Sequence, residues 1–255
     1  MKYLSMRNTQ VGAVPKSIGN LWNLETLDLR DTFVTKLPMQ IGKLWKRRHL
    51  LVYHGKFRRG FQAPTEIGNL SCVQNLGAIQ ANQSNNKILM GELGKLTQLR
   101  TLCIAKLKSE NVLTFSSSLE NLSKLRSLSI RATKRAEIVG LKSLSHGPTF
   151  LQRLYLNGRL EKIPSWISSL HSLVKLCLHW SRLMNDETLE CLQDMPNLLE
   201  LSIFFAFGGE RLCFYDWRVY EAQEIGAYRC ISIELDECGA GRNASSCTPI
   251  YHFMS

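Results

Sequence analysis

The sequence predicts a curved α/β solenoid, built from short repeated units that stack side by side. Two observations support this prediction. Residues 4–24 and 27–47 align at a constant offset of 23, and nine apolar-x-apolar pairs follow one another along the chain at a similar spacing. A period of about 20 to 50 residues indicates a repeat architecture in which each unit contacts only its neighbours.

The first two units show the repeat most clearly. Each has an apolar pair, a valine, a proline and the phrases Ile-Gly and Leu-Trp in the same order, as in Leu4, Val11, Pro15, Ile18 and Trp22. The pairs continue down the chain as Leu4/Met6, Leu27/Leu29, Leu50/Val52, Leu76/Ala78, Leu102/Ile104, Leu128/Ile130, Leu154/Leu156, Leu176/Leu178 and Leu201/Ile203. Their spacing of 22 to 26 residues is that of leucine-rich repeats.

The alternation of side chains gives each strand residue its role. Successive side chains of an extended segment point to opposite faces, so both members of a pair should enter the core while the residue between them faces solvent. Stacking then produces a parallel β-sheet on the inner, concave face. Loops, 3₁₀ turns and short helices are expected on the convex face, where Pro15, Pro38, Pro64 and Pro164 mark the returning segments.

The phasing also divides the chain and exposes weak points. We expect a leucine-rich-repeat domain of about nine units over residues 1–214, and a degenerate C-terminal tail over 215–255 in which 230–235 could add a tenth strand. Arg47 occupies the place that Leu24 holds in the previous unit. Because an unpaired charge is costly in a core, we expect Arg47 to swing out and the third unit to be looser than its neighbours. The polar run 80–87 is typical of a surface loop.

The motifs of the chain favour neither an enzyme nor a cofactor. Eight cysteines form no C-x-x-C pair and six histidines form no H-E-x-x-H, so we expect no metal site. The phosphate-binding phrase G-x-x-x-x-G-K-[ST] is missing from the sequence, so we expect no nucleotide binding. No signal peptide or long apolar run is apparent, which predicts reduced thiols, no membrane span and a cytoplasmic location.

The net charge of +11 leaves two kinds of macromolecular partner open. A basic surface suits an acidic protein or a nucleic acid. A basic nucleic-acid-binding solenoid is therefore the alternative to a protein-binding one, but the chain has no nucleic-acid motif with interleaved aromatic residues. Protein binding is favoured because solenoids offer extended concave surfaces.

The outward positions of the concave sheet form the candidate binding site. They flank the core pairs and include Tyr, Trp and Arg, the residue types enriched in binding hot spots. The candidates are Arg7, Arg30, Tyr53, Arg131, Arg153, Tyr155, Lys175, His179, Trp180 and Phe204, with Asp28 and Glu200 as acidic counterweights. Cys103 and Cys177 lie between core residues, so they are also expected to face outward.

Several segments resemble the leucine-rich-repeat region of plant nucleotide-binding disease-resistance proteins of the coiled-coil class. The first two units match the phrase L-x-L-x-x-T-x-V…L-P-x-x-I-G-x-L-x-N-L, and residues 91–130 and 151–204 carry further matching phrases. The likeness implies a protein-interaction module of innate immunity, which recognises effectors or regulates a nucleotide-binding switch domain that this sequence lacks. The implied partner is a pathogen effector, a guarded host protein or the nucleotide-binding domain of a resistance protein.

Overall fold

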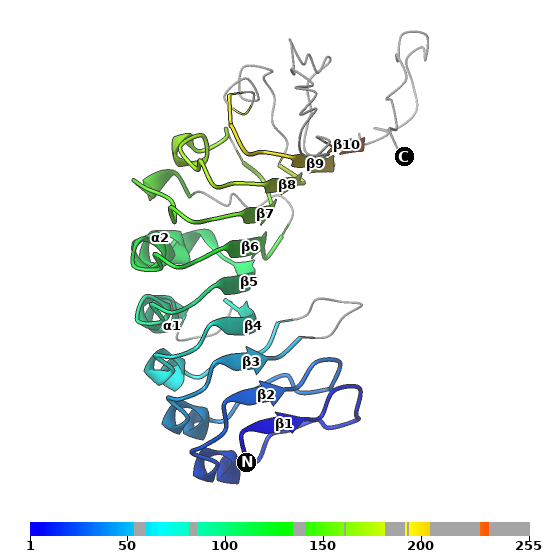
Figure 1. The fold of residues 1–255 in the computed structure, drawn as a ribbon, viewed down its shortest axis with the longest axis vertical. Helices are drawn as coiled ribbons and strands as arrows, with labels where there is room; N and C mark the ends of the chain where they lie inside the picture. Colours follow the sequence, from blue (N-terminus) through cyan, green and yellow to red (C-terminus); the bar gives the residue numbers. More distant parts are fainter. Residues whose placement is uncertain are drawn as a thin grey trace, which may run out of the picture.

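Ten strands form one parallel sheet whose spatial order is the order of the chain, from β1 to β10. The computed structural model describes residues 1–53, 60–81, 86–134, 141–160, 162–181, 192, 194–204 and 230–234. Figure 1 shows the strands stacked along the long axis of the molecule, with the helices in a column on the other side. The predicted leucine-rich-repeat solenoid is thereby confirmed.

The strands are short, and neighbouring strands pair through equivalent residues. Leu128, Leu154 and Leu176, for example, lie side by side on three successive strands. Because alternate side chains point to opposite faces, this register keeps every leucine row on the core side. The strands are Tyr3–Ser5 (β1), Thr26–Asp28 (β2), His49–Leu51 (β3), Asn75–Gln80 (β4), Thr101–Leu107 (β5), Ser127–Ala132 (β6), Arg153–Asn157 (β7), Lys175–His179 (β8), Glu200–Phe204 (β9) and Cys230–Glu234 (β10).

The segments between the strands return through 3₁₀ and α helices. These helices are η1 (Lys16–Asn20), η2 (Met39–Lys43), η3 (Thr65–Asn69), α1 (Asn86–Leu93), η4 (Ser109–Asn111), α2 (Val112–Glu120), η5 (Leu141–Ser143) and η6 (Ser165–Ile167). Pro15, Pro38, Pro64 and Pro164 each stand directly before a 3₁₀ helix, with φ from −73° to −60°. Proline suits this position because its φ is already fixed near the helical value and its missing N–H would have had no partner in the helix.

The recurring Ile-Gly phrase allows successive 3₁₀ helices to pack closely. Ile41 is fully buried in the core, while Gly42 faces the next helix. A Cβ atom added at Gly42 would lie 2.7 Å from the Cβ of Glu66, and one added at Gly68 would lie 3.1 Å from the Cβ of Glu92. A larger residue in either place would push the neighbouring repeat away.

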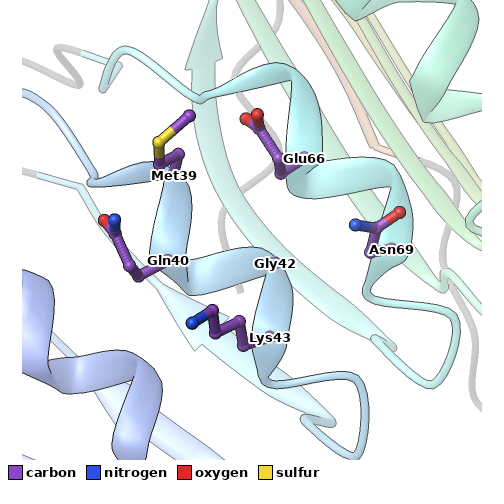
Figure 2. Close-up of a pocket in the computed structure, with 6 residues that line it drawn as sticks. All are labelled: Met39, Gln40, Gly42, Lys43, Glu66 and Asn69. Atoms are coloured by element: carbon purple, nitrogen blue, oxygen red, sulfur yellow. The ribbon is translucent and has the colours of Figure 1, made fainter.

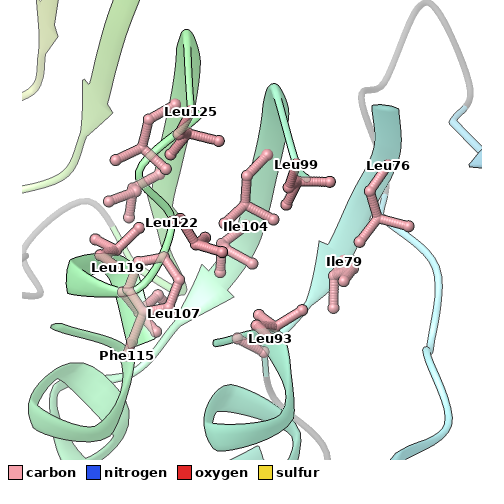
Figure 3. Close-up of a cluster of buried hydrophobic side chains, with 14 of the residues drawn as sticks. Leu76, Ile79, Leu93, Leu99, Ile104, Leu107, Phe115, Leu119, Leu122 and Leu125 are labelled. Carbon is pink, nitrogen blue, oxygen red and sulfur yellow. The ribbon is translucent and has the colours of Figure 1, made fainter. Parts of the chain in front are cut away.

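The hydrophobic core fills the space between the sheet and the convex helices. Figure 3 shows the part between β4 and β6, where aliphatic side chains from the strands meet those of α1 and α2. The labelled side chains are all buried: Leu76, Ile79, Leu93, Leu99, Ile104, Leu107, Phe115, Leu119, Leu122 and Leu125. Each repeat therefore completes the core of the next, as the stacking argument requires.

The core pair of β4 differs from the predicted pair. The sequence pattern pairs Leu76 with Ala78, but the residue of β4 that lies beside Ile104 of β5 is Ile79. A register shift in the first half of β4 inserts one extra residue, as a β-bulge does, so Leu76 and Ile79 both reach the core. The extra residue is invisible to a strict alternation rule.

The polar run 80–87 forms less of a loop than predicted. Gln80 is the last residue of β4, and Asn86 is the first residue of α1 and is buried. Residues 82–85 lie outside the described part of the chain.

Arg47 is fully buried, so the prediction that it swings out is wrong. Its backbone N–H donates to the carbonyl of Leu44 at 3.0 Å, as that of Leu24 donates to Leu21 one repeat earlier. The repeated turn thus directs this position into the core whatever residue occupies it. None of the guanidinium nitrogens of Arg47 has a hydrogen-bond partner among the described residues, and desolvation lowers the pKa of Arg47 to about 10. The looser third unit remains a prediction.

A pair of matched substitutions tests the register. Leu128 is fully buried and Ser129 is half-buried on the concave side. We expect Leu128→Asp to unfold or aggregate the protein, since an unpaired buried carboxylate costs roughly 3 kcal/mol or more. Ser129→Asp should leave the melting temperature nearly unchanged. Equal losses in thermal denaturation would show that the register is shifted by one residue.

Replacing the buried arginine should stabilise the protein. The lowered pKa of Arg47 means that burying its charged form destabilises the folded state by about 3 kcal/mol. We therefore expect Arg47→Leu to raise the free energy of unfolding by an amount of this order. The penalty applies to the charged form, so the gain should be the same at any pH well below 10. Urea denaturation at neutral pH measures it, with exposed Arg48→Leu as the control. A loss of stability on replacing Arg47 would show that the core depends on its guanidinium.

Candidate protein-interaction surface

Three rows of outward residues cross the concave face, because the register aligns equivalent residues of neighbouring strands. The first row contains Tyr3, Thr26, His49, Asn75, Thr101, Ser127, Arg153, Lys175 and Glu200. The middle row contains Ser5, Asp28, Leu51, Cys103, Ser129, Tyr155, Cys177 and Ser202. The third row contains Arg7, Arg30 and Tyr53 at one end and Arg131, Asn157, His179 and Phe204 at the other.

The predicted site residues fall into two groups on this surface. Arg7, Arg30 and Tyr53 directly follow or lie close to the ends of β1, β2 and β3. The other predicted residues lie on β6 to β9 or, in the case of Trp180, directly after β8. The strands β4 and β5 separate the two groups, so the ten residues do not form one continuous patch.

A carboxylate neutralises Arg30 of the first group. The Nε of Arg30 donates to Oδ1 of Asp28 at 2.8 Å, and its Nη2 donates to Oδ2 at 2.6 Å. Asp28 was expected to point outward, but it is buried because the guanidinium closes over it. The hydrogen bond from Arg30 lowers the pKa of the Asp28 carboxyl, and in return raises the pKa of the guanidinium. The Nε of Arg7 lies 3.9 Å from the Oδ2 of Asp31, so Asp31 partly compensates the positive charge of Arg7.

The second group combines basic and aromatic side chains. Lys175 of β8 is ion-paired with Glu200 of β9, and this hydrogen bond raises the pKa of Lys175. Arg153 stands beside Lys175 in the first row, is exposed, and forms no ion pair with the part of the chain that the structure describes. Tyr155 lies in the middle row. His179 is the last residue of β8 and lies in the third row. Arg153 therefore supplies the exposed charge of this group.

Trp180 holds an unusual backbone conformation. Its φ is 60°, in the left-handed region that bulky residues rarely adopt. Asn8, Asp31 and Lys106 have φ values between 56° and 59° at the equivalent position of their own repeats, which for Lys106 falls near the end of β5. The turn therefore imposes the conformation, which Asn and Asp tolerate better than Trp does. Strained residues of this kind are concentrated at functional sites.

Among the residues predicted to face outward, Cys177 is buried, and the side chain of Phe204 is not among those described. Cys177 was expected to face solvent but is 5% exposed, and its middle-row neighbour is the larger Tyr155. Cys103 is half-buried. Phe204 ends β9, but its side chain lies outside the described part of the structure.

A fourth row lies outside the alternating strand residues, so strand alternation does not predict it. It consists of the residue directly before each strand, and we call it the leading row. From β3 to β7 its members are Arg48, Gln74, Arg100, Arg126 and Gln152. All three arginines are exposed. The signal in the sequence is the phrase Leu-Arg before β5 and β6, repeated at an offset of 26.

A shallow hollow lies on the convex side, away from the concave rows. Figure 2 shows it between η2 and η3, with Lys43 on one helix and Glu66 on the other. Its lining residues are Met39, Gln40, Gly42, Lys43, Glu66 and Asn69. Within the described residues, no cluster of three or more His, Cys, Asp or Glu side chains could hold a metal ion. The described helices also include none that is long and apolar enough to span a membrane.

Comparison with known proteins identifies the family of these repeats and several similar proteins. A sequence model of the family described as "Leucine-rich repeat region" matches residues 1–231. The disease resistance protein Pik-2 of Oryza sativa subsp. japonica is 29% identical over 246 residues, which cover 83% of this chain and 24% of Pik-2. The disease resistance protein RPM1 of Arabidopsis thaliana is 29% identical over 158 residues, covering 60% of this chain and 14% of RPM1. The chain thus spans about a quarter or less of the length of these relatives.

Solved structures share the fold. A leucine-rich-repeat protein of Leptospira interrogans superposes with a TM-score of 0.55 and 20% identity over 80% of this chain and 55% of its own. An internalin of Listeria monocytogenes gives a TM-score of 0.52 and 20% identity, over 82% of this chain and 62% of its own. At this identity the likeness concerns the fold alone.

The Asp28–Arg30 pair should make stability depend on acid. We expect Asp28→Asn to lower the free energy of unfolding near neutral pH by about 1 to 3 kcal/mol, because a charged hydrogen bond to Arg30 is lost. The folded-state pKa of Asp28 is depressed, so its contribution is complete well above the ordinary value of 3.8 and disappears as the pH falls through the lower, folded-state pKa. Urea denaturation at pH 6 and pH 3 should therefore show a smaller difference at the lower pH. A difference that stays constant would rule out a contribution from the ionised pair.

Proposed function

Because this chain belongs to the leucine-rich repeat region family, we propose that it is a protein-interaction module of plant immunity whose concave sheet carries the binding surface. The disease resistance proteins Pik-2 and RPM1 support the setting. Stacked rows of outward side chains support the mode of action, because they turn short strands into one continuous surface. In this proposal the module acts in the cytoplasm, uses no cofactor and catalyses no reaction.

The proposed contact surface lies on β6 to β8. We call it the concave patch, and it comprises Arg131, Arg153, Tyr155, Lys175, His179 and Trp180. The observation that carries the proposal is the register, which brings Arg153 beside Lys175 and Tyr155 beside Cys177 although 22 residues separate the members of each pair. Arg7, Arg30, Tyr53 and Phe204 extend the same concave face on either side of this patch.

Charge and aromatic character favour an acidic protein as partner. Exposed basic residues such as Arg153 speed association with an acidic surface, whereas an anchored aromatic side chain slows dissociation. The candidates are a pathogen effector, a guarded host protein and the nucleotide-binding domain of a resistance protein. All three are protein surfaces, so one binding assay can compare them.

Charge reversal on the concave patch tests the proposal. Arg131→Glu with Arg153→Glu should weaken binding to the partner by about tenfold or more, which corresponds to at least about 1.4 kcal/mol. The matched control is Lys16→Glu with Lys87→Glu, two exposed lysines on η1 and α1. Surface plasmon resonance against a panel of effectors and resistance-protein nucleotide-binding domains measures both. If the control variant loses as much affinity as the patch variant, or if neither loses any, the binding surface lies elsewhere.

A further inference from the structure

The leading row has a fixed and repeated backbone. The carbonyl of Arg48 accepts hydrogen bonds from the N–H groups of both Gln74 and Asn75, at 2.8 and 3.1 Å. The carbonyl of Arg100 accepts from both Arg126 and Ser127 in the same way, at 2.9 and 3.0 Å. The side chains of the row therefore project from a rigid ladder rather than from mobile loops.

The positive charges in the middle of this row are not paired with any carboxylate in the described part of the chain. Arg100 and Arg126 precede the neighbouring strands β5 and β6, and both are exposed. Neither forms an ion pair with any residue that the structure describes. Lys124, two residues before Arg126, donates to a neutral group, the Oε1 of Gln98, at 2.7 Å. Arg153 begins the next strand, β7.

The described carboxylates that could compensate the positive charges of Arg100 and Arg126 lie at the two ends of the sheet or on the convex side. At one end, the Oε1 of Glu25 lies 3.0 Å from the Nζ of Lys2, and Glu25 also lies near Arg48. At the other end, Glu200 forms an ion pair with Lys175. From β3 to β8, the concave rows and the leading row hold no Asp or Glu among the described residues. The described acidic residues of these repeats belong to the convex elements, as Glu66, Glu92, Glu110 and Glu120 do. In these repeats the described carboxylates thus lie on the convex elements together with lysines such as Lys95, whereas the concave rows and the leading row carry none.

We propose that the leading row from β3 to β6 binds an acidic, extended polypeptide segment that lies across the strands. Strands are about 4.8 Å apart, so the row from Arg48 to Arg126 spans about 14 Å, the length of four or five extended residues. Guanidinium groups bind carboxylates through paired, charge-assisted hydrogen bonds, which suits Asp and Glu side chains. This surface is distinct from the concave patch, and no residue from Arg48 to Arg126 in the row belongs to it.

A polypeptide fits this surface better than a nucleic acid does. Binding of single-stranded nucleic acid combines basic grooves with aromatic side chains on which the bases stack. The residues beside Arg100 and Arg126 on the concave face are small or short, namely Thr101, Cys103, Ser127 and Ser129. Carboxylates need only the guanidinium groups, which the row supplies in register.

The row itself provides a conservative variant. Gln74 and Gln152 occupy the same row as the arginines, so the fold accommodates glutamine there. Arg100→Gln with Arg126→Gln should keep the melting temperature or raise it slightly, because two neighbouring like charges are removed. Lys16→Gln with Lys87→Gln removes the same charge from the convex side and serves as the control.

Fluorescence anisotropy with a labelled probe tests the proposal on the full chain at physiological salt. The probes are a peptide of alternating Glu and Ser, the same peptide with Gln in place of Glu, and single-stranded and duplex RNA of equal charge. We expect binding of the Glu peptide but not of the Gln peptide, and a loss of about tenfold or more in the Arg100/Arg126 variant. The Lys16/Lys87 variant should bind the Glu peptide as the wild type does.

Three results would overturn the proposal. Tighter binding of either RNA than of the Glu peptide would assign the row to nucleic acid. An equal loss of affinity for the Glu peptide in the Lys16/Lys87 variant would show that binding depends on net charge and not on the leading row. Unchanged binding in the Arg100/Arg126 variant would place the acidic segment elsewhere, and none of these results bears on binding at the concave patch.

Discussion

The parallel hydrogen-bonded ladder between successive repeats fixes how they stack, and both the core and the surface rows follow from it. A strand with two inward leucines cannot bury them alone, so each repeat is stable only against its neighbour. Backbone hydrogen bonds fix the offset between them, and the pairing of Leu128 with Leu154 and of Leu154 with Leu176 follows. Because the backbone sets the register, equivalent residues stand in rows whatever their side chains are. These rows convert a linear repeat into a surface.

The same ladder forces some residues into unfavourable surroundings. Arg47 is buried because its turn repeats the hydrogen bond of the preceding unit, and not because a guanidinium is favoured there. Trp180 takes a left-handed φ because the turn after the strand requires it. In both places the summed stability of the stacked repeats outweighs a local cost of a few kcal/mol.

Electrostatics distinguish the ends of the concave face from its middle. At one end Arg30 is held by Asp28, and at the other Lys175 is held by Glu200. Between these pairs the outward rows carry basic, neutral polar, small and aromatic residues but no described Asp or Glu, whereas the described carboxylates lie on the convex helices. The concave patch and the leading row both lie on the side without described carboxylates. The patch has aromatic members, whereas the row carries the guanidinium groups of Arg48, Arg100 and Arg126, with Gln74 between the first two.

Leucines at intervals of 22 to 26 residues are enough to predict the repeat architecture, since stacked parallel strands are the way to bury them. The sequence also placed Arg153, Tyr155 and Lys175 on the concave side, because alternation along a strand is a local property. The folded molecule was needed to show that Ile79 rather than Ala78 completes β4, that Arg47 is buried, and that the guanidinium of Arg30 covers Asp28. These outcomes depend on contacts between repeats or on the backbone path that such contacts enforce. Residue type and spacing within one unit do not contain that information.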